Sequence, residues 1–197
     1  MTALSAGRRS GARRTGGRAP VALTGTPGVG KSAVAGRLAT RWTAVEVADL
    51  ARAAGAARTV RGGVEVDLPR LRRALRSPGA LKGVDLVVGH LAHLLPVREA
   101  IVLRCQPRAL LRRLARARRG SRADRAANSV SEALDLVLIE ALGEGLPVFE
   151  VDTTGRPVRE VAREVERRLR FGGPPRVGEV DWLRQRSVTA HLLDGVG

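Results

Sequence analysis

The chain of 197 residues carries 35 basic and 19 acidic side chains, which give it a formal charge of +16. With two Phe, two Trp and no Tyr it is poorly suited to bind nucleic acid on stacked aromatic rings, although its charge still attracts polyanions such as RNA. Its single cysteine, Cys105, excludes an intrachain disulfide and makes the cytosol the default compartment, and no apolar run approaches the roughly 20 residues that cross a bilayer.

The amino-terminal segment, "MTALSAGRRSGARRTGGRA", contains five arginines and no acidic residue. This composition predicts a disordered basic tail over residues 1–19. Three interpretations of the tail stay open: a solvated extension, a contact with RNA, or an organellar transit peptide.

Beyond the tail, short apolar runs alternate with segments of helical periodicity, which is typical of an α/β fold with a parallel sheet. We expect five strands, near Val21–Thr24, Val45–Val47, Leu86–Val88, Ile101–Arg104 and Val148–Val151. We expect helices at Ser32–Thr40, Leu68–Leu75, Arg108–Ala117, Asp124–Leu142 and Pro157–Arg170. The longest of these helices should turn its apolar residues inward, namely Val130, Leu134, Val137, Leu138 and Ala141.

A phosphate-binding loop stands between the first strand and the first helix. Residues 25–32, "GTPGVGKS", fit the pattern G-x-x-x-x-G-K-[ST]. The glycines let successive backbone N–H groups face the phosphates at the positive end of the following helix. Lys31, one of only two lysines in the chain, would reach the outer phosphates, and Ser32 would hold Mg²⁺. The ligand predicted from this pattern is ATP or GTP with Mg²⁺.

The elements around this loop predict one P-loop domain. It should cover residues 20–171, as a parallel five-stranded sheet flanked by helices in the manner of a nucleoside monophosphate kinase. Residues 172–197 should form a carboxy-terminal appendage, with Trp182 as its one sizeable anchor.

Two further segments favour a kinase over a GTP-binding switch, because neither lysine stands in an N/T-K-x-D base-reading motif. "VEVADLARAAG" places Asp49 and Arg52 just beyond the second strand, where a nucleotide acceptor would dock. "RLARARRGSRADR" is an arginine run with a glycine break, and we interpret it as a mobile lid that stabilises charge moving between phosphates. The alternative for this run is a solvated helix face.

Two histidines follow the third strand in "VDLVVGHLAHLLP". No nearby cysteine or further histidine completes a metal site with His90 and His93. His90 could stand beside the phosphates or pack structurally, and we expect His93 to be structural.

The order of several motifs resembles one known family. These motifs are "LTGTPGVGKS", "DLAR", "VEVDLPRL", "GHLAHLLP", "IVLRC", "RL…RRG", "N…E" (Asn128 and Glu132) and "VDTTG". From about Val21 to Arg170 the chain is similar to the small atypical adenylate kinases, also described as ATPases of small-ribosomal-subunit maturation, and most of all to their archaeal members.

The resemblance implies a fold, an activity and partners. The family transfers phosphate from ATP to AMP with Mg²⁺ and gives two ADP. It also has ATPase activity, and it associates with a small-subunit ribosomal protein and ribosomal RNA during assembly of the small subunit. For this chain we expect a cytoplasmic location. The same residues do not settle whether the acceptor is AMP, CMP or dAMP.

Matched positions imply roles for individual residues. The ATP-binding loop would use Gly28, Gly30, Lys31, Ser32 and Ala33. The monophosphate-binding segment would span about residues 46–71 and use Asp49, Leu50 and Arg52. The lid would span about residues 118–128, with Arg119 contacting ATP, and the catalytic set would be Lys31, His90 and Arg119.

Two positions depart from the family pattern. The acidic residue expected two positions before His90 is Val88, which cannot order Mg²⁺ or a water. The aromatic residue usual after the lid Arg-Gly is Ser121, which removes a stacking group.

These observations leave two main hypotheses and one minor one. The first is an adenylate kinase with some ATPase activity. The second is an ATP-switched assembly factor of the small subunit with slow hydrolysis, which the positive charge favours. The minor hypothesis is a P-loop kinase of a small metabolite such as shikimate.

Overall fold

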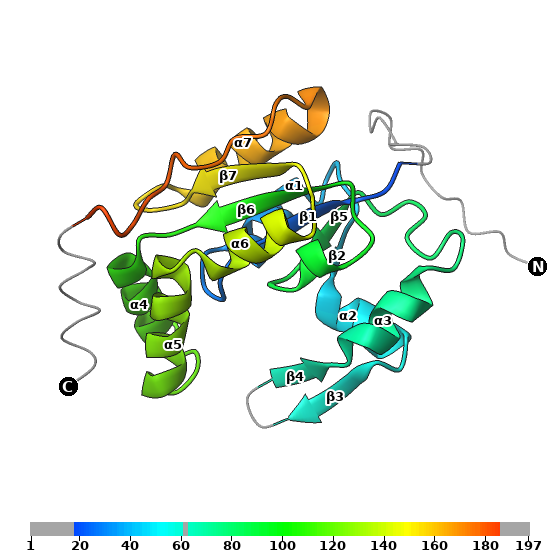
Figure 1. Cartoon of the computed structure of the whole chain (residues 1–197), viewed down its shortest axis with the longest axis horizontal. Helices are drawn as coiled ribbons and strands as arrows, with labels where there is room; N and C mark the ends of the chain where they lie inside the picture. The colour runs from blue at the N-terminus through cyan, green and yellow to red at the C-terminus, as the bar shows by residue number, and fades with distance from the viewer. Residues whose placement is uncertain (1–17, 61–62, 186–197) are drawn as a thin grey trace, which may run out of the picture.

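The computed structural model describes residues 18–60 and 63–185, and Figure 1 shows it as a ribbon. Its centre is a parallel sheet in the strand order β2-β5-β1-β6-β7. The strands are β1 Val21–Thr24, β2 Ala44–Glu46, β5 Leu86–Val88, β6 Glu99–Arg104 and β7 Val148–Asp152. After β1 the chain adds β2 and β5 on one side of this strand and then β6 and β7 on the other side. The direction in which strands are added therefore reverses at β1. In open α/β sheets such a reversal creates a crevice at the carboxyl ends of the strands.

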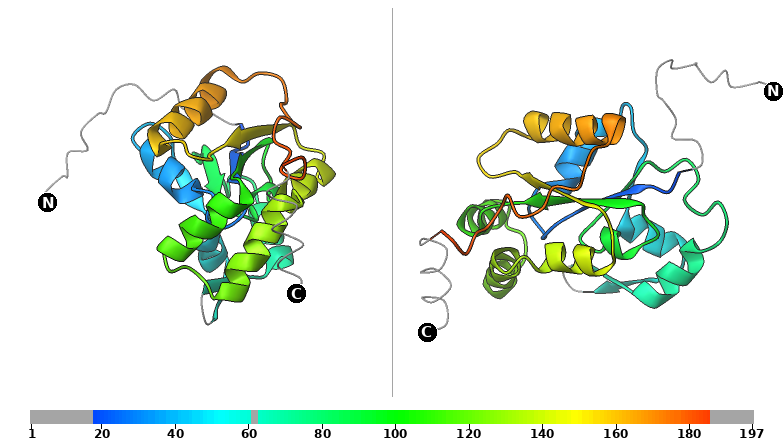
Figure 2. Two further views of the ribbon diagram at one scale, coloured as in Figure 1. Left: turned by 90° about the vertical axis from the view of Figure 1, so that its left-hand side faces the viewer. Right: turned by 45° about the horizontal axis from the view of Figure 1, so that its top comes forward.

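Helices cover both faces of the sheet. One face holds α1 (Lys31–Leu38) and α7 (Val158–Phe171), which Figure 2 shows side by side above the strands. The other face packs against α2, α3, α6 and a short 3₁₀ helix: Val47–Ala53, Leu68–Leu75, Leu136–Gly143 and Ala92–Leu94. Two buried apolar clusters result, one between each face and its helices. The sheet side chains alternate between them, as the period of a strand requires.

The predicted α/β fold with a parallel five-stranded sheet is confirmed. Each expected strand is present within a residue or two, and α3 has the predicted bounds, with Pro69 in its first turn. Val47 is a correction, because it begins α2 instead of ending β2. Cys105 follows β6 and is fully buried, as expected for a core position.

The single helix expected over Asp124–Leu142 is wrong. The structure has α5 (Arg122–Ala133) and α6, separated by Asp135 with φ of 57°. Aspartate tolerates this left-handed conformation better than most residues, and its carboxylate is held here by Arg104. The break turns Val130 and Leu134 outward, where they are 42% and 43% exposed instead of buried.

A small extension was also missed. β3 (Ala57–Val60) and β4 (Gly63–Val66) form an antiparallel hairpin that lies with α2 and α3 to one side of the sheet (Figure 1). β3 is mostly exposed and is joined to β4 by an exposed arginine–glutamate pair, so the hairpin shows in the sequence only as the short alternation of Val64 and Val66.

The segment after α7 folds back over the domain. Arg176 adds a single parallel bridge to β7, and the buried Trp182 packs against Ala133 of α5. The proposed limits of the tail and the appendage stay predictions, since residues 1–17 and 186–197 lie outside the described part. Within the described residues, no helix is both long and apolar enough to cross a membrane.

Candidate nucleotide-binding site

The phosphate loop occupies the reversal point of the sheet, directly after β1. Gly25, Gly28 and Gly30 have φ of 131°, 97° and 113°, a region that favours glycine. A Cβ on Gly25 would lie 2.3 Å from the carbonyl oxygen of Leu103, and one on Gly28 would lie 2.7 Å from a methyl carbon of Leu114. The loop backbone therefore packs directly on β6 and on α4 (Pro107–Arg116). This close fit fixes the curl that a phosphate group requires.

A second contact holds the middle of the loop. The hydroxyl of Thr153, just after β7, donates to the carbonyl of Val29 at 3.1 Å, and the guanidinium of Arg113 donates to the same threonine at 2.9 Å. Val29 itself is buried. The loop is thus tied to the ends of β6 and β7 before any ligand arrives, which lowers the ordering cost of binding.

Lys31 is the first residue of α1 and bends back over the loop. Its Nζ donates to the carbonyl oxygens of Gly25 at 2.6 Å and Thr26 at 3.0 Å. An ammonium held in this way stands where the loop N–H groups and the helix terminus would attract phosphate.

Burial lowers the pKa of Lys31 from 10.5 to about 8. The charges of Glu46 and Glu132 oppose this shift, and that of Arg119 adds to it. Loss of water and the positive charge of Lys31 also lower the pKa of His90. The structure therefore brings His90 and Arg119 each within electrostatic range of Lys31.

This pKa predicts how ATP affinity depends on pH. Phosphate binds the ammonium form of Lys31, so affinity should be constant below its pKa and fall by up to about tenfold per pH unit above it. Calorimetric titration with ATP from about pH 7 to about pH 9.5 measures the effect. Lys31→Arg stays charged throughout this range and should abolish the pH dependence, whatever its affinity. An affinity of the unmodified protein that does not change above its pKa would contradict the expectation.

The remaining predicted loop and lid residues lie around this centre. Ser32 and Ala33 are exposed in the first turn of α1. Arg119 is exposed in the turn that joins α4 to α5. Ser121, which replaces the family's aromatic residue, begins α5 as its N-cap and forms a capping box with Asp124. The serine therefore fixes the start of α5, a structural contribution that a stacking residue would not make.

The predicted monophosphate-binding residues lie on α2, and their side chains form no hydrogen bond or ion pair with the phosphate loop among the described residues. Asp49 and Arg52 form an exposed ion pair with each other on α2, at 2.6 Å. Leu50 packs partly into the core between α2 and the sheet.

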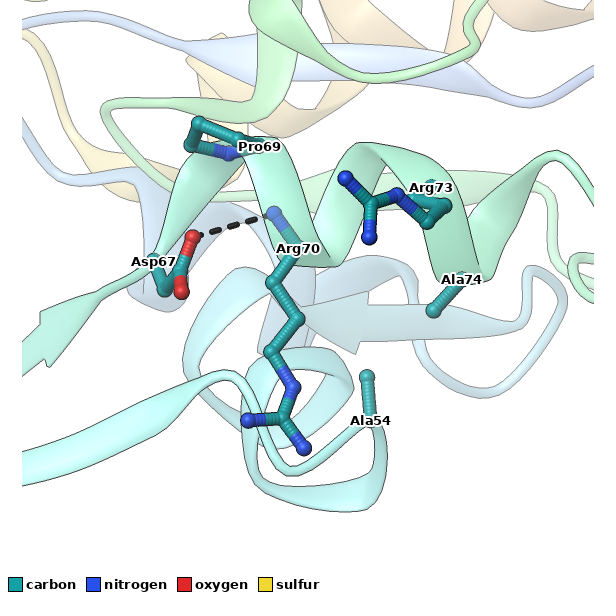
Figure 3. Close-up of a pocket in the computed structure, with 6 residues that line it drawn as sticks. All are labelled: Ala54, Asp67, Pro69, Arg70, Arg73 and Ala74. Atoms are coloured by element: carbon teal, nitrogen blue, oxygen red, sulfur yellow. Dashed lines mark hydrogen bonds between the residues drawn. The ribbon is translucent and has the colours of Figure 1, made fainter.

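A hollow of about 600 Å³ lies in the same part of the fold, between the end of α2 and α3. Figure 3 shows the arginines of α3 at this hollow. It is lined by Ala54, Asp67, Pro69, Arg70, Arg73 and Ala74. Four of these residues fall in the predicted monophosphate-binding segment of about residues 46–71, but neither Asp49, Leu50 and Arg52 nor any residue of the phosphate loop lines the hollow.

His93 lies in the core, the position expected of a structural residue. The ring is buried, with Nδ1 3.0 Å from the hydroxyl of Thr24 and Nε2 3.2 Å from the carboxylate of Glu140. It links the end of β1 to α6, one turn away from His90.

Sequence reasoning missed a buried ionic network behind the loop. Glu132 accepts a 2.5 Å hydrogen bond from the hydroxyl of Thr26 and a 3.0 Å hydrogen bond from Nε of Arg104. The indole of Trp182 also donates to Glu132, at 3.1 Å. Burial by itself lowers the pKa of Arg104, but the carboxylates around it raise the pKa above its ordinary value. The only signals in the sequence were an arginine at the end of a buried strand and a glutamate in the "N…E" motif.

The donor atoms at the loop suit Mg²⁺. The hydroxyl of Ser32 and the carboxylate of Glu46, whose charge acts on Lys31, are hard oxygen ligands. Mg²⁺ in phosphate sites usually keeps several waters and takes only one or two protein ligands. Among residues 18–60 and 63–185, no group of three or more His, Cys, Asp or Glu side chains is arranged to hold a metal by itself. The residues present thus fit a metal that arrives with nucleotide phosphates.

Comparisons with known proteins agree with this geometry. Residues 21–135 match the protein family described as "AAA domain". A Thermococcus onnurineus protein named "Putative adenylate kinase" is 38% identical over 175 residues, which cover 88% of this chain and 96% of the relative. A Pyrococcus abyssi protein of the same name is 40% identical over 165 residues, which cover 82% and 90%. The solved tunicamycin resistance protein of Deinococcus radiodurans has a similar fold, with a TM-score of 0.50 and 20% identity over 81% of this chain and all of that one.

Proposed function

Because the chain belongs to the AAA-domain family, and to the same family as the archaeal relatives described above, we propose that it is an adenylate kinase that transfers the terminal phosphate of ATP to AMP and forms two ADP. ATP hydrolysis would accompany transfer when the acceptor is absent. The observation that carries the proposal is the pre-formed phosphate loop with Lys31 folded over it, in a chain similar over nearly its whole length to proteins of that name.

The donor half of the site would hold ATP through the loop. Backbone N–H groups near Gly28 and Gly30 and the ammonium of Lys31 would bind the outer phosphates, with Ala33 beside them in the first turn. Ser32 would hold Mg²⁺, which would neutralise charge on the phosphate oxygens when bound.

Transfer itself needs little covalent chemistry from the protein. Phosphoryl transfer depends on positioning and on cations placed where charge develops. We propose that Arg119 closes over the triphosphate and that His90 stands beside the transferred group. Lys31 raises the local positive charge that favours a neutral His90, which could then hydrogen bond without repelling the other cations.

The acceptor would dock on α2. Asp49, Leu50 and Arg52 would bind AMP, and Arg52 would leave Asp49 for a phosphate oxygen. Because this ion pair is largely exposed, its loss costs little. The test is ADP formation by the purified protein with ATP and Mg²⁺, with and without AMP. Strong dependence on AMP supports the kinase, whereas slow production indifferent to AMP contradicts it.

A second candidate is an ATP-switched assembly factor of the small ribosomal subunit, with ribosomal RNA and a ribosomal protein as partners. It is favoured by the charge of +16 and by the exposed arginines along the α4–α5 turn, namely Arg112, Arg116, Arg118, Arg119 and Arg122. Such a surface would give salt-dependent RNA contact, which a cytoplasmic metabolic kinase does not require.

Deletion of residues 1–18 tests this candidate. These residues lie almost entirely outside the described part and carry five arginines. The deletion should weaken binding to ribosomal RNA in a filter assay and lower its salt dependence, while the rate of ADP formation stays unchanged. A fall in the catalytic rate after the deletion would contradict the role given to the tail.

A further inference from the structure

Val88 leaves the phosphate loop without the carboxylate expected on β5, and the sheet places another one beside it. β2 and β5 pair in parallel, with Glu46 opposite Val88 at the carboxyl ends of both strands. Residues opposite each other in a parallel pair point to the same face of the sheet. Ala44, two residues earlier on β2, packs into the cluster that contains Val88 and α1. Glu46 therefore lies on the α1 face, next to the loop.

Within residues 18–60 and 63–185, no cationic side chain forms an ion pair with the carboxylate of Glu46. Its charge is the strongest of those that oppose the lowered pKa of Lys31, so the two side chains are near each other. Yet no hydrogen bond or ion pair reaches the Glu46 side chain from any described residue, although the residue is half-buried. A carboxylate that no described residue engages in this way is available to bind a cation.

The other acids near the loop are excluded by their positions or contacts. Asp85 precedes β5, so it lies at the opposite end of the strand, and its carboxylate accepts a 2.8 Å hydrogen bond from the backbone of Thr43. Glu132 is occupied by the network with Thr26 and Arg104. Asp49 pairs with its neighbour on α2 and is 62% exposed.

We propose that Glu46 supplies the carboxylate that Val88 lacks, and that it orders the Mg²⁺ of bound ATP, either directly or through one of the metal's waters. The proposal rests on the proposed function, since the metal arrives with the nucleotide. Glutamate is only one methylene longer than aspartate, so its side chain alone does not cover the distance of about 4.8 Å between neighbouring strands. A water bound to the metal would bridge the remaining distance to Glu46. Hard oxygen donors are what Mg²⁺ prefers.

The test is Mn²⁺ affinity in the presence of a non-hydrolysable ATP analogue, measured on the full chain by electron paramagnetic resonance. Glu46→Gln should weaken Mn²⁺ binding in the ternary complex by about 10–100-fold. Binding of the analogue without metal should be unchanged or tighter, because a negative charge near the phosphates is gone. Glu46→Asp keeps the carboxylate and should weaken Mn²⁺ binding less.

Glu160→Gln is the matched control, since Glu160 is an exposed glutamate in the first turn of α7 and its charge is not among those that shift the pKa of Lys31. It should leave Mn²⁺ binding unchanged. If Glu46→Gln binds Mn²⁺ as tightly as this control, the proposal is overturned while the kinase assignment stands. If the unmodified protein binds no ATP analogue, the proposed function itself fails, and the two failures are thus distinguishable.

Discussion

Lys31→Ala should lower AMP-dependent ADP formation by on the order of 10²–10³-fold. The loop holds this ammonium between the carbonyls of Gly25 and Thr26, at the start of the helix that follows. Removing it takes away charge stabilisation during transfer as well as in the bound state. Steady-state ADP formation and ATP affinity, measured on the same preparation, separate the two effects.

The chain provides a matched control for this variant. Lys82, the only other lysine, is exposed in the turns before β5, so Lys82→Ala should retain full activity. Both variants should keep the unfolding transition of the unmodified protein, because neither side chain fills the core. Retention of more than a tenth of the activity by a folded Lys31→Ala protein would show that the loop does not act through its lysine.

Arg104→Met should destabilise the fold by about 3–5 kcal/mol, since it leaves buried carboxylates without their cation. Arg104 is 1% exposed and pairs with Glu132, Asp135 and Glu150 at once. Methionine fills much of the same volume but supplies no donor. Urea denaturation followed by circular dichroism gives the free energy of unfolding.

The exposed pair of the hairpin is the control for this measurement. Arg58 and Glu65 lie in solvent, where an ion pair contributes little, so Arg58→Met should barely change the free energy of unfolding. Equal effects of Arg58→Met and Arg104→Met would contradict the role given to the buried network. Because Glu132 also holds Thr26, loss of Arg104 should loosen the phosphate loop and weaken ATP binding as well.

Much of the fold could be predicted because its signals are local. Buried parallel strands are continuous apolar runs, and the phosphate loop has a spacing that few other structures share. The start of α3 follows from Asp67 as N-cap and Pro69 in the first turn. These features depend on neighbours within a few residues, so the printed sequence contains them.

The rest depends on contacts between distant residues. The apolar spacing of residues 124–142 fits one helix, and only the ion pair from Asp135 to Arg104, 31 positions away, explains why the chain breaks there. Glu46 reads as an ordinary polar residue between two valines until the sheet pairs it with Val88. The hairpin of β3 and β4 leaves only the short alternation of Val64 and Val66, because most of its other side chains are exposed. Each of these features needs the strand order or a tertiary contact to be seen.

The most direct test of the account is the fate of the terminal phosphate of ATP labelled with ³²P. The protein is incubated with the labelled ATP, Mg²⁺ and AMP, and the products are separated by chromatography. The account predicts label in ADP, formed from AMP, at a rate well above the release of inorganic phosphate. Label found in inorganic phosphate alone, at a rate that AMP does not change, would contradict it and identify the chain as an ATPase.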